Sequence, residues 1–268
     1  MLGRKILRRF SEILCDLQYE SGGLRVISLQ NPSKKNALSS LLIRQMIENL
    51  QKISDDPESR CLIIRSKVEN AFCTGADLKE RATMSQADTE KFVTQLRSTF
   101  NMIEDLTIPT IACIEGYALG GGLEMALACD LRYGSPNAKI GLVETKIAVI
   151  PGAGGTYRLP KVVGLQKAKE MVFTAEIYSA EDGKKFGIFN DVALDAYGKC
   201  LEVATGIGKN GPVAVRMAKK AMNLGFGQDR STGMDIESLC YAKIVGTQDR
   251  IEGLLAFKEK RKPVFKGN

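Results

Sequence analysis

The chain has 268 residues, of which 44% are hydrophobic and 26% are charged, as in an ordinary globular protein. No apolar run approaches the ~20 residues of a membrane-spanning helix, so we expect no membrane insertion. The chain has no histidine, and its seven cysteines form no CxxC pair. Ligands for zinc or haem are therefore scarce, and we predict no metal site.

The net charge is +7, and the basic residues are concentrated at the two ends of the chain. Such charge suits nucleic acid, anionic lipid or a phosphate-bearing small molecule, but a solvated basic surface explains it equally simply. Residues 1–22 form an Arg-rich, amphipathic leader with traits of a mitochondrial targeting segment or its remnant. A solvated leader without that role is the alternative.

The following segments alternate between strand-like and helix-like patterns. Short runs rich in β-branched residues predict strands at 24–30, 61–65 and 110–114. Helical periodicity is present in residues 40–53 and in a long segment that opens at Ser85 and ends near Glu104. This alternation predicts an α/β core over residues 23–195, built from right-handed parallel units.

After about residue 195 the strand signals are absent, and residues 196–268 show helical patterns at 196–207, 212–224, 231–245 and 248–261. The last two segments carry more apolar residues, such as Met234, Leu239 and Leu254, than a small helical region could bury alone. We therefore expect this region to self-associate. Docking onto the chain's own core is the alternative.

A GxGxxG match at residues 206–211, with Asp229 downstream, suggests a dinucleotide site. That fingerprint requires a strand before the glycines. Here the preceding residues look helical and Pro212 follows at once. We predict that this match binds no nucleotide.

Two glutamates, Glu124 and Glu144, stand beside glycine-rich runs. In a chain without histidine, proton transfer near neutral pH falls to carboxylates, tyrosine, lysine or cysteine. The loop at 116–122 connects a predicted strand to a helix, where the Gly121 amide could donate to a developing oxyanion. The loop at 70–80 could present a second amide. A tight turn and a carboxylate that complements the helix dipole are the structural alternatives.

Three motifs resemble the enoyl-CoA hydratase/isomerase (crotonase) family: FCTGADLKE at 72–80, GYALGGGLEMALACD at 116–130, and GLVETK at 141–146 with IPGAGGT at 150–156. The likeness runs from about residue 23 to the C-terminus. It is similar in detail to the mitochondrial branch that contains methylglutaconyl-CoA hydratase and enoyl-CoA hydratase domain-containing proteins. The resemblance implies a spiral of ββα units with a helical C-terminal trimerisation region.

The resemblance also implies an activity, the reversible addition of water across the 2,3 double bond of an enoyl-CoA. The amides of Ala76 and Gly121 would bind the thioester oxygen, Glu124 would activate the water, and Glu144 would protonate the α-carbon. The implied CoA contacts are Lys34, Lys35, Ala37, Thr74, Asp77, Leu78, Lys79 and, from a neighbouring subunit, Phe257 and Lys260. No cofactor beyond the CoA substrate is expected. Isomerase activity, for which many relatives keep one carboxylate, is the alternative.

Tyr157 departs from the family pattern, because many relatives have glutamine there, and it would alter the acyl pocket. The expected partners are the acyl-CoA substrate and further copies of the chain, as a trimer or a dimer of trimers. The expected location is the mitochondrial matrix, with a bacterial cytoplasm as the alternative. A relative binds AU-rich RNA through a lysine-rich helix. The matching residues 39–55 hold only Arg44 and Lys52 as cations, so we expect no specific RNA binding.

Overall fold

A computed structural model describes residues 12–268, so the first eleven residues of the expected leader lie outside the described chain. The larger sheet has six strands in the order β1-β2-β3-β5-β7-β10. Its first pair is antiparallel, and all later pairs are parallel. These strands are β1 (Cys15–Tyr19), β2 (Leu24–Leu29), β3 (Cys61–Ser66), β5 (Thr110–Ile114), β7 (Leu131–Gly134) and β10 (Asp191–Val192).

A smaller sheet has the order β4-β6-β8-β9. It consists of β4 (Ala71–Cys73), β6 (Tyr117–Leu119), β8 (Lys139–Gly141) and β9 (Tyr178–Ser179). Consecutive strands alternate between the two sheets. The first strand of each pair lies in the large sheet and the second in the small sheet, as in β3 and β4, β5 and β6, and β7 and β8. Helices follow each pair, so the structure confirms the expected spiral of ββα units.

The helices that follow these strand pairs are α2 (Leu78–Arg81), α3 (Gln86–Asp105), α4 (Gly121–Ala128), α5 (Gly155–Val163) and α6 (Leu165–Thr174). The remaining helices of the core are α1 (Ser40–Ser54), α7 (Ala180–Lys185) and the 3-10 turns η1 (Ser21–Gly23), η2 (Pro32–Lys34) and η3 (Glu144–Ile147). The strands predicted at 24–30, 61–65 and 110–114 and the helix at 40–53 are confirmed. The small sheet was not predicted, because strands of two or three residues are too short to show a pattern.

Residues 15–19, near the end of the segment expected as a leader, form β1 and belong to the large sheet. All five residues of β1 pair with β2. The turn between the two strands contains Gly22 and Gly23, both at positive φ, which favours glycine. In β1 the apolar Cys15, Leu17 and Tyr19 alternate with Asp16 and Gln18, a strand pattern that was not recognised. The strand lies at the edge of the sheet, and only Cys15 within it is fully buried.

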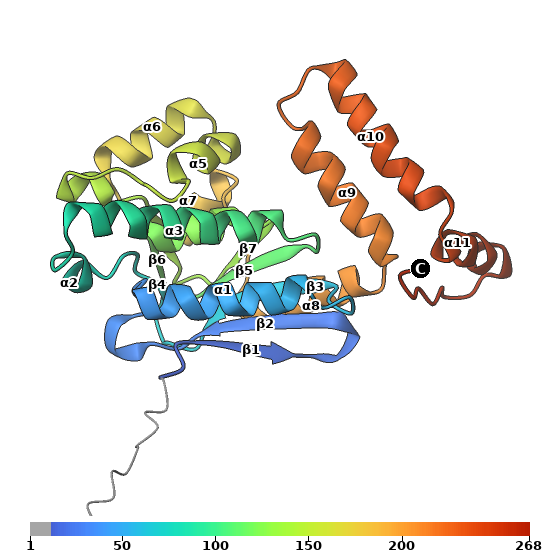
Figure 1. Ribbon diagram of the computed structural model, residues 1–268, viewed down its shortest axis with the longest axis horizontal. Coiled ribbons are helices and arrows are strands. Elements are labelled where there is room, and N and C mark those ends of the chain that lie inside the picture. Colours follow the sequence, from blue (N-terminus) through green and yellow to red (C-terminus); the bar gives the residue numbers. More distant parts are fainter. Residues whose placement is uncertain (1–11) are drawn as a thin grey trace, which may run out of the picture.

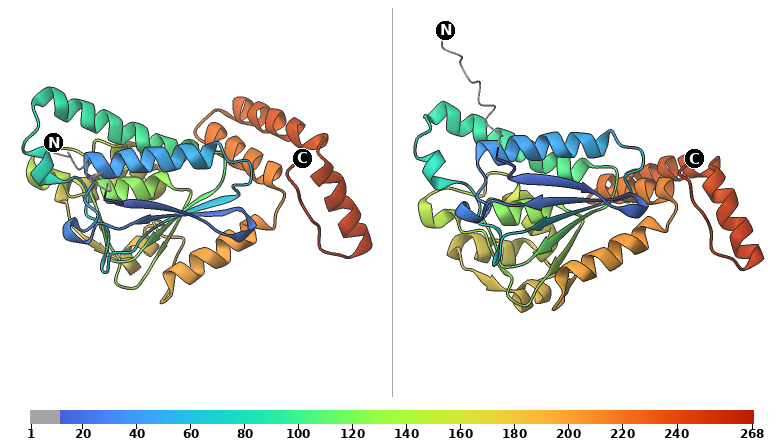
Figure 2. Two further views of the ribbon diagram at one scale, coloured as in Figure 1. Left: turned by 60° about the horizontal axis from the view of Figure 1, so that its bottom comes forward. Right: turned by 90° about the horizontal axis from the view of Figure 1, so that it is seen from below.

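The large sheet separates two hydrophobic cores. In β3, Leu62 and Ile64 belong to the core that contains α1 and α3, whereas Cys61 and Ile63 belong to the core under α8 (Ala196–Gly208). This division follows from the alternation of side chains along a strand. Figure 2 shows α1 and α3 on one face of the sheet and α8 on the other.

The C-terminal region is helical, as predicted, and three of its helices extend beside the core (Figure 1). After α8 these are α9 (Pro212–Gly225), α10 (Arg230–Val245) and α11 (Gln248–Glu259). Helix α10 has one fully buried residue, Cys240. Leu239 and Leu254 are 69% and 59% exposed. No helix among the described residues has the length and apolar character needed to cross a membrane.

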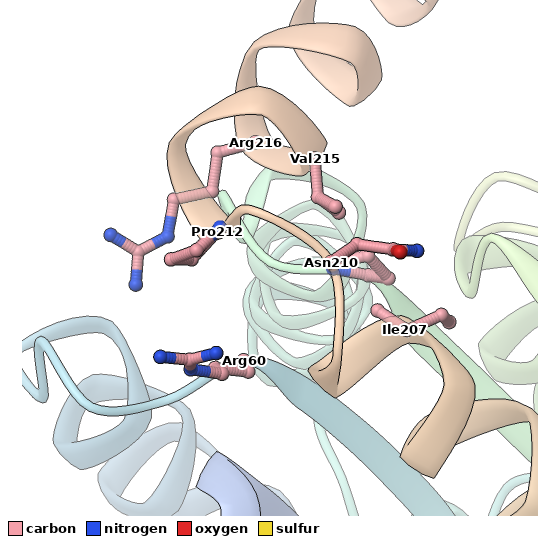
Figure 3. A pocket seen from close by; sticks show the side chains of 7 residues that line it. Arg60, Ile207, Asn210, Pro212, Val215 and Arg216 are labelled. Carbon is pink, nitrogen blue, oxygen red and sulfur yellow. The ribbon is translucent and has the colours of Figure 1, made fainter. Parts of the chain in front are cut away.

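The junction between α8 and α9 contains the glycines of the GxGxxG match. Because α8 supplies a helix before them rather than a strand, the structure excludes the dinucleotide fingerprint here. Arg60 donates to Gly208 O (2.9 Å) and Arg216 donates to Ser59 O (2.9 Å), which ties α8 and α9 to the start of β3. Figure 3 shows both arginines beside a pocket of about 10 Å³, far too small for a nucleotide.

Candidate active site

The loop between β6 and α4 brings two parts of the chain into close contact. Gly120 has φ 51° and ψ −123°, a conformation open mainly to glycine, and α4 begins at the next residue. A Cβ on Gly122 would lie 2.1 Å from Cys73 O, so only glycine lets α4 approach β4 this closely. The N-terminus of α4 therefore lies next to the loop that follows β4.

Two backbone amides meet at this contact, those of Ala76 and Gly121. Gly75 is adjacent to Gly121, since a Cβ on Gly75 would lie 3.4 Å from Gly121 N. Leu38 N donates to Gly75 O (2.8 Å), which fixes the Ala76 loop against the segment before α1. Among the hydrogen bonds of residues 12–268, neither the Ala76 nor the Gly121 amide donates to a protein acceptor. Both are free to bind an oxygen from a ligand.

Glu124, in the first turn of α4, is 2% exposed and is held by a second loop. Its Oε1 accepts from Ala153 N (2.8 Å) and Gly155 N (2.7 Å). Burial raises the pKa of Glu124, although these two amides favour the ionised form. Its Oε2 lies toward Gly121, because a Cβ there would be 3.9 Å away. One oxygen is thus anchored and the other faces the free amides.

Glu144 begins η3 and also lies beside this loop. A Cβ on Gly120 would lie 3.2 Å from Glu144 Oε1. Both carboxylate oxygens of Glu144 are buried and have no hydrogen-bond partner among the described residues. Burial, and then the negative charge of Glu124, raise the pKa of Glu144 to about 7. Near neutral pH this carboxyl can both hold and release a proton.

One cavity of about 780 Å³ contains all four groups, the two glutamates and the residues that carry the two amides. Its volume suits a small-molecule ligand. The walls also include residues of α2, α3 and the segment that follows Glu144. The structure therefore brings together every catalytic candidate named from the sequence. The arrangement can bind an oxyanion and move protons on either side of it.

The predicted CoA contacts fall into two groups. Seven of them lie at or just after the end of η2 and around the N-terminus of α2: Lys34, Lys35, Ala37, Thr74, Asp77, Leu78 and Lys79. Of these, Thr74 and Leu78 line the cavity. Lys34 Nζ donates to Asp77 Oδ2 (2.5 Å), and Thr74 N donates to Lys35 O (3.3 Å), so the two segments are joined. Asp77 also caps α2 through the Lys79 and Glu80 amides.

The other two predicted contacts, Phe257 and Lys260, lie on α11 and are not brought to the cavity of the same chain. Figure 1 places α11 at the opposite end of the molecule from α2. The Phe257 side chain is 87% exposed. Tyr157 does not line the cavity either, so its expected effect on the acyl pocket is not supported by its position. It is 59% exposed, and its hydroxyl accepts from Lys161 Nζ (2.6 Å).

The sequence analysis missed the loop that holds Glu124. Gly154 has φ 112°, and its neighbours present the Ala153 and Gly155 amides to the carboxylate. Arg158 steadies this loop by donating to Ala153 O (3.1 Å), and it also pairs with Glu104 (2.6 Å). The glycine-rich sequence at 150–155 was a signal of unusual backbone, but nothing in it points to Glu124 as the partner.

Comparison with known proteins agrees with this geometry. The family model described as Enoyl-CoA hydratase/isomerase matches residues 19–268. The mouse protein "Methylglutaconyl-CoA hydratase, mitochondrial" is 47% identical over 94% of this chain and 82% of its own length. "Probable enoyl-CoA hydratase 2, mitochondrial" from Arabidopsis thaliana is 46% identical over 94% of this chain and 84% of its own length.

A solved structure shows the same fold. The crystal structure of an enoyl-CoA hydratase from Bacillus anthracis has a TM-score of 0.94 and 41% identity, and it covers 96% of this chain and 100% of that one. The family model matches nearly the whole chain, and these relatives are more than 40% identical to it over the matched residues. The chain therefore belongs to the enoyl-CoA hydratase/isomerase family.

Proposed function

We propose that this chain hydrates the 2,3 double bond of an enoyl-CoA with Glu124 and Glu144 as its two catalytic carboxylates. The observation that carries the proposal is the position of Glu144, whose unpartnered oxygens face the same cavity as Glu124. The thioester oxygen binds the amides of Ala76 and Gly121. These donors stabilise the charge that develops on the oxygen as water adds to the β-carbon.

The environments of the two glutamates support different roles. Burial raises the pKa of Glu124, but the Ala153 and Gly155 amides that bind one of its oxygens favour the ionised form. The other oxygen of Glu124 accepts a proton from water. Glu144 has a pKa of about 7 and is therefore partly protonated near neutral pH. It donates its proton to the α-carbon of the substrate. The reaction runs in both directions and requires no group beyond the CoA substrate.

The experiment is to replace each glutamate by glutamine and to measure hydration of crotonyl-CoA and 3-methylglutaconyl-CoA. Each variant should lose about 10²–10⁴-fold in kcat. Near wild-type kcat in either variant would contradict the two-carboxylate assignment. Conversion of 3-enoyl-CoA to 2-enoyl-CoA is measured in parallel, because an isomerase would keep that activity after the loss of one glutamate.

We also propose that the chain acts as a trimer or a dimer of trimers in which α11 of one subunit reaches the CoA of another. The exposed apolar side chains of α10 and α11 support association. Lys260→Glu should raise KM for an acyl-CoA and have little effect on a pantetheine thioester, which lacks the nucleotide phosphates. A fully active monomer in sedimentation, or equal effects on both substrates, would contradict this arrangement.

Specific RNA binding is not part of the proposed function. The solvent-exposed side of α1 carries Arg44 and Lys52 against Glu48 and Asp55, so it has no net positive charge. Binding to the phosphate backbone of RNA requires several Lys or Arg side chains whose charge is not neutralised by neighbouring Asp or Glu. Affinity for AU-rich RNA should be weak and non-specific at ~0.15 M salt. A submicromolar, sequence-selective dissociation constant would overturn this expectation.

For the cellular location, the names of the mouse and Arabidopsis relatives support a mitochondrial protein, and the B. anthracis relative fits a bacterial cytoplasm. We propose the matrix. Residues 1–14, which precede β1, can be fused to a fluorescent reporter and imaged. A diffuse cytosolic signal would count against import through this segment.

A further inference from the structure

Three cationic side chains, Arg81, Arg97 and Lys146, line the cavity that contains the two glutamates. They come from α2, α3 and η3 and so surround the cavity from separate elements. Apolar side chains form much of the remaining wall: Leu78, Val93, Leu96, Val143, Ile147, Val149 and Ile150. Among the described residues that line it, Glu124 and Glu144 are the only acids.

None of these cations is neutralised by the chain itself. Within residues 12–268, none of the three forms a salt bridge with a carboxylate. The Arg81 guanidinium lies 5.5 Å from the centre of the Phe92 ring. Arg97 Nε donates to Gly152 O (2.9 Å), a neutral acceptor. The cavity therefore has positive charge available for a ligand.

We propose that Arg81, Arg97 and Lys146 select an enoyl-CoA whose acyl group ends in a carboxylate. This inference rests on the proposed function, which fixes the thioester oxygen at the amides of Ala76 and Gly121. With the thioester held there, the far end of a short acyl chain remains inside the cavity. A guanidinium or ammonium group then forms a charge-assisted hydrogen bond with the terminal carboxylate.

The charges of the catalytic pair make such cations necessary. An anionic acyl group that enters the cavity meets Glu124 and Glu144 and is repelled by whichever is ionised. Lys146 lies two residues beyond Glu144 in η3. Arg97 donates a hydrogen bond to the carbonyl of Gly152, and the next amide, that of Ala153, donates to Glu124. The Arg97 charge favours the ionised form of Glu124, and Lys146 adds a second positive charge to the wall of the same cavity. A neutral acyl chain would need no such compensation.

The phosphates of CoA are the competing ligand for these cations. However, the basic residues expected to meet the nucleotide, Lys34, Lys35 and Lys79, are not among the residues that line the cavity. The chain therefore holds one set of cations outside the cavity and another set inside it. This separation favours the acyl group as the ligand of the inner set.

The test compares glutaconyl-CoA with 5-methylhex-2-enoyl-CoA, in which an isopropyl group replaces the carboxylate at the same chain length. Arg81→Met and Lys146→Met should each lower kcat/KM for glutaconyl-CoA roughly ten-fold, and the double variant on the order of 100-fold. Values for the isopropyl substrate should stay within about two-fold of wild type. Lys91→Met, an exposed lysine of α3 that does not line the cavity, is the matched control.

Each outcome decides the question. Equal losses on both substrates would assign the cations to CoA or to the fold and would overturn the inference. Unchanged kcat/KM for glutaconyl-CoA in the double variant would also overturn it. If the wild-type chain hydrates the isopropyl substrate but not glutaconyl-CoA, this inference fails while the proposed function stands. If it hydrates neither of these nor crotonyl-CoA, the proposed function itself fails.

Discussion

Replacement of Glu144 by glutamine tests the environment of this carboxyl independently of catalysis. The folded protein raises its pKa from an ordinary 4.5 to about 7, mainly by burial. At about 1.36 kcal/mol per pKa unit, the ionised form is disfavoured by about 3 kcal/mol in the folded state. Between pH 4.5 and 7 the unfolded chain releases this proton while the folded chain keeps it. The free energy of unfolding of the wild type therefore falls across this window.

Glutamine has nearly the same shape but cannot ionise, so Glu144→Gln removes this pH-dependent loss. Urea unfolding from pH 4 to pH 9 should show the variant gaining stability relative to wild type as the pH rises. The gain should reach about 3 kcal/mol near pH 8 and then level off. Glu48→Gln, the same change at an exposed position of α1, is the control and should show no such trend.

The same substitution should remove a limb of the pH–rate profile. As the proton donor in hydration, Glu144 must be protonated, so kcat/KM of the wild type should fall above about pH 7. The variant should be slower by about 10²–10⁴-fold and should lose this decline. A stability difference that does not change with pH, or a variant whose kcat stays within about three-fold of wild type, would refute the reasoning.

Substitutions at three further positions test the site and the packing that supports it. Gly121→Pro deletes the amide donor at the first position of α4, where proline is tolerated, and should lower kcat by about 10²–10³-fold, whereas Gly121→Ala keeps the donor and should be far more active. Gly122→Ala places a Cβ 2.1 Å from Cys73 O and should lower the free energy of unfolding by about 1–3 kcal/mol or more, measured by urea titration. Lys219 forms a buried salt bridge with Asp130 (2.8 Å) that joins α9 to the core. Lys219→Met breaks it and should lower the free energy of unfolding by roughly 3 kcal/mol, measured by thermal unfolding. An unchanged Tm would contradict the role of this salt bridge.

The sequence was sufficient for those features that depend on residues near one another in the chain. Periodicity located α1, α3 and α9, because each of these helices carries its own apolar stripe. The helices α10 and α11 have no such stripe and were delimited by the glycines at 225 and 246. The glycine-rich motifs around Gly121 and Glu144 suggested the catalytic candidates, and the roles of these residues came from the family resemblance that the motifs carry. The edge strand β1 was missed, although its residues alternate between apolar and polar, because it directly follows the basic leader and its pairing with β2 is the main evidence for it.

Other features depend on which distant residues meet, and only the tertiary structure decides them. Glu144 acquires its raised pKa because folding buries it next to Glu124, twenty residues earlier in the chain. Likewise, the amides that bind Glu124 belong to Ala153 and Gly155, and nothing in the sequence around these residues indicates that they contact Glu124. The cations Arg81, Arg97 and Lys146 look like ordinary surface charges until the spiral places them around one cavity. Local patterns fix the elements, whereas desolvation and electrostatic interactions act through space and require the folded arrangement.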